Sequence, residues 1–272
     1  MKTRIIVAVI LLPLLLIVIL ALPKILTAIL FGLLSALMAY ELLTGTGYVK
    51  HTRLVIYSMV AAFLVSLWSY FGMPYAWGLL GALVFGALLF GEMMLSHMKL
   101  RFSKVALCIM AGLVFPFLLC SLVRIQSYEG AGRYYIMLPF VVAFLSDTCA
   151  YFIGKFFGKH QLAPVISPKK TVEGALGGFA GAVIGMVIYG VLLDLAFGFT
   201  VNYLYAIIYG VIGSLAGMFG DLCFSAIKRQ TGIKDFGNIL PGHGGMLDRF
   251  DSMMIVGPLV EALLILLPVA VK

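Results

Sequence analysis

Charged residues are scarce in this chain. Asp, Glu, Lys and Arg together make up 11% of its 272 residues, whereas hydrophobic residues make up 63%. The mean hydropathy is +1.13. A soluble globular protein cannot bury this much apolar surface, so the composition excludes a soluble fold and indicates lipid as the solvent.

Histidine and cysteine are rare as well, with four of each. The cysteines lie in or at the ends of apolar runs, and no Cys–His cluster has the spacing of a zinc site. We interpret them as small buried hydrophobic residues. No repeat of 20–50 residues is evident, although an inverted-repeat transporter is expected to show similar halves.

Long apolar runs are what the sequence does contain. A helix needs about 20 mostly apolar residues to span a membrane, and nine such runs can be counted. The runs are continuous rather than alternating, which predicts helices and not a barrel. We therefore predict an all-α, polytopic integral membrane protein with about nine transmembrane helices. The runs cover residues 5–22, 25–43, 54–71, 75–96, 103–123, 134–152, 174–197, 201–223 and 253–271.

Basic residues are divided unevenly by nine crossings. Fifteen Lys and Arg residues fall on one side and four on the other, within a net charge of +8. The positive-inside rule makes the first side cytoplasmic, so we expect the polar loops on that side to face the cytoplasm. Glu41 and Glu92 lie near cytoplasmic ends of runs, where we expect their carboxylates to reach water in structural roles.

Polar residues concentrate in the second half of the chain. We predict a single membrane domain over residues 1–272, made of an N-terminal helical scaffold (1–130) and a catalytic half (131–272). The catalytic half contains a long polar loop at 225–252. Long loops without regular structure are uncommon and usually functional or disordered, and flanking apolar runs disfavour disorder here.

Asp147 lies inside the sixth run, about one turn from its expected cytoplasmic end. An ionisable group inside a span is costly and is a functional candidate by default. Tyr151, Gly154 and Gly158 follow on roughly the same helical face, so a ligand could lie along this groove. The alternative is a carboxylate paired with a neighbouring Lys or Arg for stability.

A phosphate-binding segment is predicted just before the seventh run. Ser167 and Thr171 can donate hydrogen bonds to phosphate oxygens, Lys169 and Lys170 supply charge, and the start of the next helix favours an anion. The alternative is a capped helix start, with Thr171 or Ser167 as the cap and the lysines facing lipid headgroups.

Asp221 ends the eighth run, and Ser225 and Lys228 share its face if the helix continues. Seven residues advance about 10 Å, which suits a metal at one end of a triphosphate and a cation at the other. A carboxylate at a helix C-terminus opposes the helix dipole, which favours a metal partner. The alternative is a contact between Asp221 and Ser225, or a salt bridge between helices.

Asp248 and Asp251 open the ninth run, where capping of that helix is the alternative explanation. The glycines around His243 permit positive φ and close approach of a ligand to the backbone. Carboxylate oxygens suit Mg²⁺, and Asp221, Asp248 and Asp251 could supply them. The glycines are Gly242, Gly244 and Gly245, and the loop's cations are Lys228, Arg229, Lys234 and Arg249.

The motif Ser225-Ala-Ile-Lys-Arg…Leu240-Pro-Gly-His-Gly-Gly-Met-Leu-Asp-Arg-Phe-Asp251 closely resembles the signature of CDP-diacylglycerol synthases, also called phosphatidate cytidylyltransferases. The resemblance continues upstream through Ser146–Tyr151 and Ser167–Gly174, so it covers about residues 146–252. The first 130 residues are similar to the family only in being hydrophobic.

The resemblance implies transfer of CMP from CTP to phosphatidate, with Mg²⁺, room for a second cation, and a homodimer among membrane lipids; no nucleic-acid partner is expected. It implies Asp221 and Asp248 as the metal ligands, assisted by Asp251 or Asp147. It also implies phosphate contacts from a set of residues in both segments. They are Ser167, Lys169, Lys170, Thr171, Ser225, Lys228, Arg229, Lys234, His243, Gly244, Gly245 and Arg249.

Three other classes compete with this interpretation. A CTP-dependent polyprenol kinase acts on a neutral hydroxyl and has less need of the paired lysines and arginines. A transporter could use Asp147 and Glu261 as an ion path, but the polar residues concentrate on one face rather than at the midplane. A CDP-alcohol phosphatidyltransferase is disfavoured, because its clustered Asp pattern is absent from the sequence.

Overall fold

The structure is a computed structural model that describes residues 13–97, 99–239 and 244–272. The chain forms two compact units. Unit 1 comprises Met1–Ser127 and Gln230–Phe250, and unit 2 comprises Tyr128–Arg229 and Asp251–Lys272. The division after Ser127 falls close to the expected one at residue 130, but most of the polar loop belongs to unit 1. The single membrane domain stays a prediction.

Seven helices in the described residues are long and apolar enough to cross a membrane. They confirm an all-α, polytopic membrane protein, with two short two-stranded sheets added. The helices span Lys24–Gly45, Thr52–Phe71, Tyr75–Leu95, Phe102–Gln126, Gly132–Phe157, Val172–Phe197 and Tyr203–Gln230.

The predicted count of nine is not confirmed. The first run, 5–22, lies partly on residues 1–12, outside the described residues. The last run, 253–271, forms helix α13 (Met253–Leu266) of 14 residues, followed by the short strand β4 (Ala270–Val271). Fourteen residues rise about 21 Å, less than the ~30 Å of a hydrocarbon core, so apolarity alone overestimated this helix.

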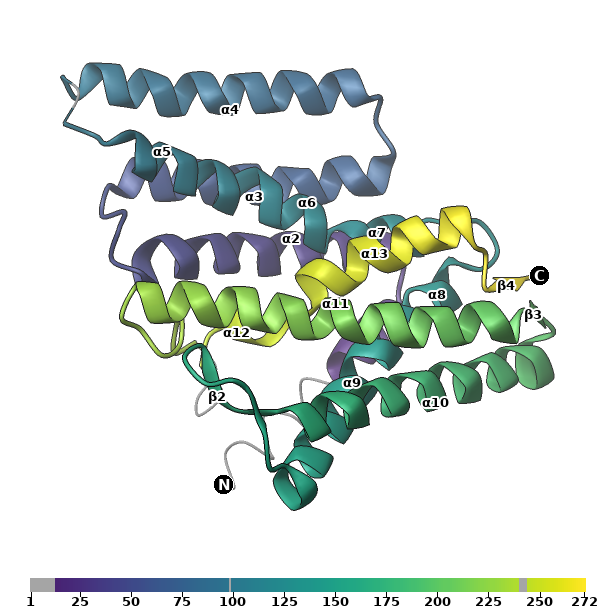
Figure 1. The fold of residues 1–272 in the computed structure, drawn as a ribbon. Helices are drawn as coiled ribbons and strands as arrows, with labels where there is room; N and C mark the ends of the chain where they lie inside the picture. Colours follow the sequence, from purple (N-terminus) through teal and green to yellow (C-terminus); the bar gives the residue numbers. More distant parts are fainter. Residues whose placement is uncertain (1–12, 98, 240–243) are drawn as a thin grey trace. The chain divides into compact units, whose positions relative to one another are not determined.

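The first long helix of unit 1 is the most buried of the unit's spans. Its main part, α2, runs beside α3 (Figure 1). Ser66 donates a hydrogen bond of 2.6 Å to the carbonyl of Ala28, and the Phe250 ring packs edge-on against Phe31 at 6.3 Å. The elements are α2 (Lys24–Tyr40), the π-helix η1 (Glu41–Gly45), α3 (Thr52–Phe71), α4 (Tyr75–Leu95), α5 (Phe102–Ile109), η2 (Met110–Val114), α6 (Phe115–Leu119), α7 (Ser121–Gln126) and α12 (Leu247–Phe250).

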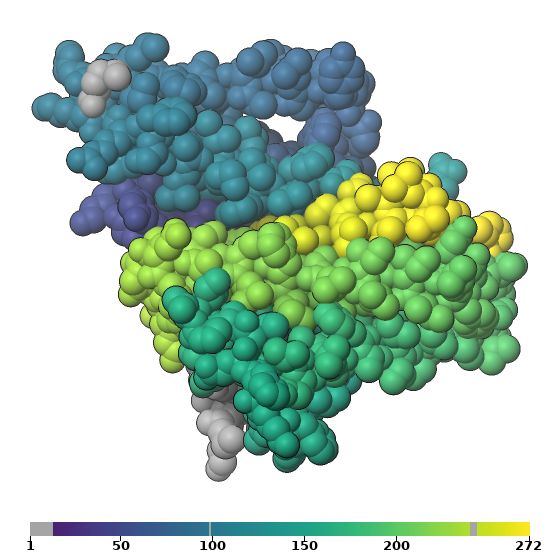
Figure 2. All heavy atoms as spheres, viewed as in Figure 1, coloured from purple at the N-terminus to yellow at the C-terminus, as the bar shows by residue number. Residues whose placement is uncertain are grey.

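Helix α4 is the least covered element of unit 1. Only Phe85 and Leu89 are buried along its 21 residues. Figure 2 shows an opening between part of α4 and the rest of this unit. The exposed side chains of α4 are almost all apolar, as expected of a helix with lipid as its solvent.

Unit 2 is built from three long helices, and α10 and α11 run antiparallel to each other (Figure 1). The hairpin β1–β2 connects α9 to α10, and β3 pairs with β4 so that the chain's last residues lie at the α10–α11 connection. The elements are α8 (Gly132–Tyr135), α9 (Met137–Phe157), β1 (Gln161–Ala163), β2 (Ser167–Thr171), α10 (Val172–Phe197), β3 (Thr200–Val201), α11 (Tyr203–Gln230), α13 and β4.

Glycines on α10 let α9 and α10 pack backbone to backbone. A Cβ added at Gly181 would lie 2.6 Å from Cys149 Cβ, and one at Gly178 would lie 3.1 Å from the Ser146 carbonyl. Small residues at this spacing permit such an approach in membranes. The glycines of this seam are Gly174, Gly177, Gly178, Gly181 and Gly185.

Gly220 lies at a close contact within unit 2. A Cβ there would lie 2.9 Å from the Asp251 carbonyl and 3.2 Å from Ser252 Cα. Helix α11 therefore packs directly against the chain segment that precedes α13, and Gly220 serves that close contact.

From the close packing of α9 against α10 we expect Gly181→Ala to lower the thermal unfolding midpoint of the detergent-solubilised protein. The added methyl group would overpack this contact, and overpacking typically costs about 1–3 kcal/mol. The matched control is Gly86→Ala on α4, which has nothing within 4 Å of its added Cβ. The control should be neutral or stabilising by up to ~1 kcal/mol, since alanine suits a helix better than glycine. Equal midpoints for the two variants would contradict this packing.

Candidate active site

A cavity of about 540 Å³ lies within unit 2, between α9, the β1–β2 hairpin, α10 and α11. It brings together five of the predicted site residues from three elements, α9, β2 and α11. They are Asp147, Lys169, Lys170, Thr171 and Asp221. Ala150, Leu162, Ala175 and Met218 contribute apolar walls, so charged groups and a hydrophobic surface meet in one place.

Asp221 is paired in the structure. One of its carboxylate oxygens lies 2.6 Å from Lys170 Nζ, and the other accepts a 3.1 Å hydrogen bond from Ser225. The Asp221–Ser225 contact that the sequence offered as an alternative to a metal is thus present, whereas the salt bridge joins α11 to the strand β2 (Ser167–Thr171) and not to another helix. Helix α11 continues through polar residues to Gln230, so the condition under which Ser225 and Lys228 share the face of Asp221 is met, and Asp221 does not lie at the helix C-terminus.

Asp147 likewise lies deeper in its helix than expected, since α9 continues to Phe157. Tyr151 and Gly154 line the cavity with it, as the predicted groove requires. Gly158 does not line it; a Cβ there would lie 2.8 Å from Thr171 Oγ1, so this glycine admits the end of β2.

Residues 167–171 form the strand β2, and Ser167 begins it opposite Ala163. Thr171 is the N-cap of α10, because its hydroxyl accepts a 3.1 Å hydrogen bond from the Gly174 N–H. The predicted capping role is therefore confirmed. Its contact with phosphate stays a prediction, as does that of Ser167.

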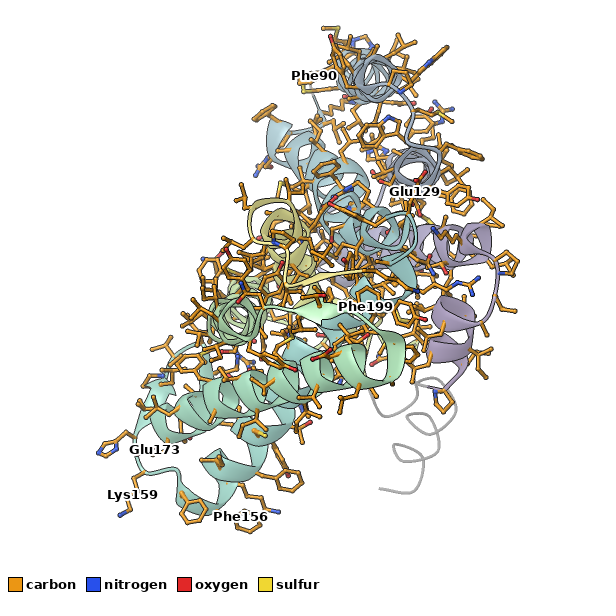
Figure 3. All side chains as sticks on the ribbon, turned by 90° about the vertical axis from the view of Figure 1, so that its right-hand side faces the viewer. Phe90, Glu129, Phe156, Lys159, Glu173 and Phe199 are labelled. Atoms are coloured by element: carbon orange, nitrogen blue, oxygen red, sulfur yellow. The ribbon has the colours of Figure 1, made fainter. Side chains whose placement is uncertain are left out.

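A second set of contacts holds the hairpin against α10. The Glu173 carboxylate accepts hydrogen bonds from the N–H groups of Lys159 and His160, at 3.1 and 3.2 Å, and lies 2.6 Å from the His160 ring. Lys159 and Glu173 are labelled at this end of unit 2 in Figure 3. On the other side, Arg229 Nε donates to the Ile166 carbonyl at 3.2 Å. The β1–β2 hairpin that carries Lys169 and Lys170 is thus fixed from α10 and from α11.

Asp251 lies between α12 and α13 and not in the first turn of a long helix, so the capping explanation is wrong for this residue. Burial, together with the carboxylates of Asp221 and Asp147, raises the pKa of Asp251 to about 7, while nearby Lys228 lowers this pKa. Three carboxylates in this part of unit 2 therefore repel one another, and a bound cation would relieve the repulsion.

Within unit 1, Asp248 organises the polar loop. The side chain is 7% exposed, and its Oδ2 accepts hydrogen bonds from the N–H groups of Phe236 and Gly245 at 2.8 and 3.1 Å. Gly244 has a φ of +83°, a conformation that favours glycine. Asp248 is the second residue of α12, so the expectation that it is the N-cap of a long helix is also wrong.

Glu41 corrects the expectation that its carboxylate reaches water. It is 2% exposed, and its two oxygens accept hydrogen bonds from the N–H groups of Met246 and Leu247 at 2.9 and 2.8 Å. The sequence carried a signal for this, because an ionisable residue inside an apolar run is a functional candidate. Glu92, by contrast, pairs with Arg53 at 3.4 Å.

The remaining predicted residues are distributed over both units. Ser225 is buried and Lys228 half-buried in unit 2, while Lys234 and Arg249 are exposed in unit 1. His243 lies outside the described residues. Asp221 and Asp248 belong to different units, so their shared coordination of one cation stays a prediction.

No group of three Asp, Glu, His or Cys side chains in the described ranges is arranged to hold a metal ion by itself. Mg²⁺ is commonly bound by one or two carboxylates together with substrate phosphates. Asp147 and Asp221 in one cavity, with the raised pKa of nearby Asp251, form a donor set that fits such an ion.

Comparison with known proteins identifies the family of the chain. Residues 2–267 match the model of the cytidylyltransferase family. Phosphatidate cytidylyltransferases of Staphylococcus saprophyticus and Staphylococcus aureus are each 42% identical over 168 residues, and that of Staphylococcus haemolyticus is 41% identical over 164. Each match covers 60% of this chain and 60% of the relative. With the family model matched over nearly its whole length, the chain belongs to the cytidylyltransferase family.

Proposed function

We propose that this membrane protein transfers CMP from CTP to phosphatidate, giving CDP-diacylglycerol and pyrophosphate. The observation that carries the proposal is the cavity of unit 2, where Asp147 and Asp221 face Lys169 and Lys170 beside apolar walls. A phosphorylated lipid and a nucleotide together need this combination of carboxylates for a metal, cations for phosphate and a hydrophobic surface for acyl chains.

The reaction makes modest chemical demands on the protein. A phosphate oxygen of phosphatidate attacks the α-phosphorus of CTP, a new P–O bond forms, and the bond to the β-phosphate breaks to release pyrophosphate. The nucleophile is already anionic near neutral pH, so no strong general base is required. Catalysis then depends on holding two anions together and on neutralising charge as the leaving group departs.

The residues divide between these tasks. Asp221 and Asp248 are the proposed Mg²⁺ ligands, with Asp147 or Asp251 assisting, and the ion would neutralise charge on the CTP phosphates. Lys170 Nζ lies 2.6 Å from the Asp221 carboxylate. From this position the ammonium group could form an ion pair with an incoming phosphate instead. Lys169, Lys228, Arg229, Lys234 and Arg249 are the other proposed phosphate contacts.

The setting of the enzyme is also part of the proposal. The excess of basic residues on one side supports a cytoplasmic active site, where CTP is available, in a cell inner membrane. Phosphatidate would enter sideways from the inner leaflet. The homodimer rests on the family resemblance alone.

The substrate assignment predicts that purified full-length protein releases pyrophosphate from CTP and Mg²⁺ only when mixed micelles contain phosphatidate. Diacylglycerol, which lacks the attacking phosphate, is the matched control and should give none. A polyprenol that is required instead, with CDP as the product, would replace this assignment with a lipid kinase.

The site assignment predicts that Asp221→Asn lowers kcat by at least about 100-fold, as expected when one preorganised charge is lost. Asp194→Asn is the matched control, because Asp194 is an exposed carboxylate near the end of α10 whose hydroxyl partner is Tyr203 at 3.3 Å. Steady-state pyrophosphate release measures both. Equal kcat values for the two variants would remove Asp221 from the site.

The raised pKa of Asp251 predicts a pH dependence of stability in the presence of a chelator. Between the ordinary pKa near 4 and about 7, the folded state binds more protons here than the unfolded state, so stability falls as pH rises. Asp251→Asn lacks this contribution. The thermal midpoint of Asp251→Asn, relative to that of the wild type, should therefore rise as the pH is raised from 5 to 7.5. A difference between the two midpoints that does not change with pH would contradict the raised pKa of Asp251.

A further inference from the structure

The buried carboxylate of Glu41 is the strongest feature that the proposed mechanism leaves unused. It lies in η1, the π-helical turn at the end of α2, and is 2% exposed. Both oxygens are engaged by the backbone more than 200 positions later in the sequence, at Met246 and Leu247. A buried charge is costly unless it is compensated, so such a contact requires a specific benefit.

The two N–H groups that donate hydrogen bonds to Glu41 lie at the start of α12. The first N–H groups of any helix lack intrahelical partners and are normally capped by a nearby residue in the sequence. Here the cap comes from the N-terminal scaffold. Helix α12 carries Asp248 and Arg249, two of the residues proposed to bind metal and phosphate. Its position within unit 1 therefore depends on Glu41.

The loop is shaped around this carboxylate. A Cβ at Gly245 would lie 2.6 Å from Glu41 Oε2, and one at Gly237 would lie 2.5 Å from Glu41 Oε1. Gly45, at the end of η1, is likewise in tight contact with the Phe236 carbonyl. Both arms of the loop thus approach η1 at positions where only glycine leaves enough space, and π-helical turns often occur at functional sites.

We infer that Glu41 is a positioning residue for the reaction: its carboxylate caps α12 and fixes the loop so that Asp248 is held ready for the metal. Asp248 adds a second tie inside the loop, to Phe236 and Gly245. The N-terminal scaffold therefore contributes to the site through one side chain. The kinetic part of this inference rests on the proposed function.

The test compares Glu41→Gln with Glu92→Gln in the full-length protein in detergent. Both variants exchange a glutamate of unit 1 for its amide, but Glu92 contacts Arg53 and Tyr57 and not the loop. In Glu41→Gln, the new NH₂ group faces a backbone N–H that it cannot satisfy. Without substrates, hydrogen exchange at the Met246 and Leu247 amides should be about tenfold faster than in Glu92→Gln, from loss of a charged acceptor.

Kinetics separate positioning from a merely structural role. For Glu41→Gln we expect kcat to fall about 10–100-fold and the Mg²⁺ concentration for half-maximal rate to rise, as when support of a metal ligand is lost. The thermal midpoint should match that of Glu92→Gln. If Glu41→Gln does not fold, Glu41→Asp, which keeps the charge but withdraws it by one methylene, is measured in the same way.

Unchanged amide exchange, or a kcat and Mg²⁺ requirement equal to those of Glu92→Gln, would overturn the inference. Failure of the proposed function is distinguishable from this result. If wild-type protein releases no pyrophosphate with CTP, phosphatidate and Mg²⁺, the proposed function fails, and amide exchange alone decides whether Glu41 fixes the loop.

Discussion

The close approach of α9 and α10 is the constraint on which the candidate site in unit 2 depends. Glycines on α10 remove the side chains that would separate the two backbones, and Ser146 and Cys149 occupy the space. This contact sets Asp147 beside the hairpin that carries Lys169 and Lys170. In lipid, where apolar surface gives no drive to associate, such close packing is the available source of helix affinity.

The buried carboxylates of both units have partners that compensate their charge. Carboxylates and lysines share one cavity in unit 2, and Lys170 compensates Asp221 directly. Burial and its like-charged neighbours leave Asp251 with a raised pKa. In unit 1 the buried carboxylates of Glu41 and Asp248 are compensated by hydrogen bonds from backbone N–H groups instead of by lysines. Asp221 is therefore held by a cation, whereas Glu41 and Asp248 are held by backbone N–H groups of the loop.

Much of this could be predicted from the sequence, because spacing and residue type are local properties. Apolar runs indicated the long helices, and a capped helix start at Thr171 or Ser167 was one of the alternatives that the residues offered. Helix ends were less predictable. The apolar runs were ended too early for α9, which continues past Lys155 to Phe157, and for α11, which continues through polar residues to Gln230, whereas α13 ends before its run does.

The sequence by itself determined a polytopic helical membrane protein and the residues of its candidate site. Only the tertiary structure decided what those residues touch: the pairing of Lys170 with Asp221, the loop contacts of Asp248, and the burial of Glu41 against Met246 and Leu247. The physical reason is that a hydrogen bond across two hundred residues leaves no periodicity in the sequence. It arises only when packing brings the two segments together.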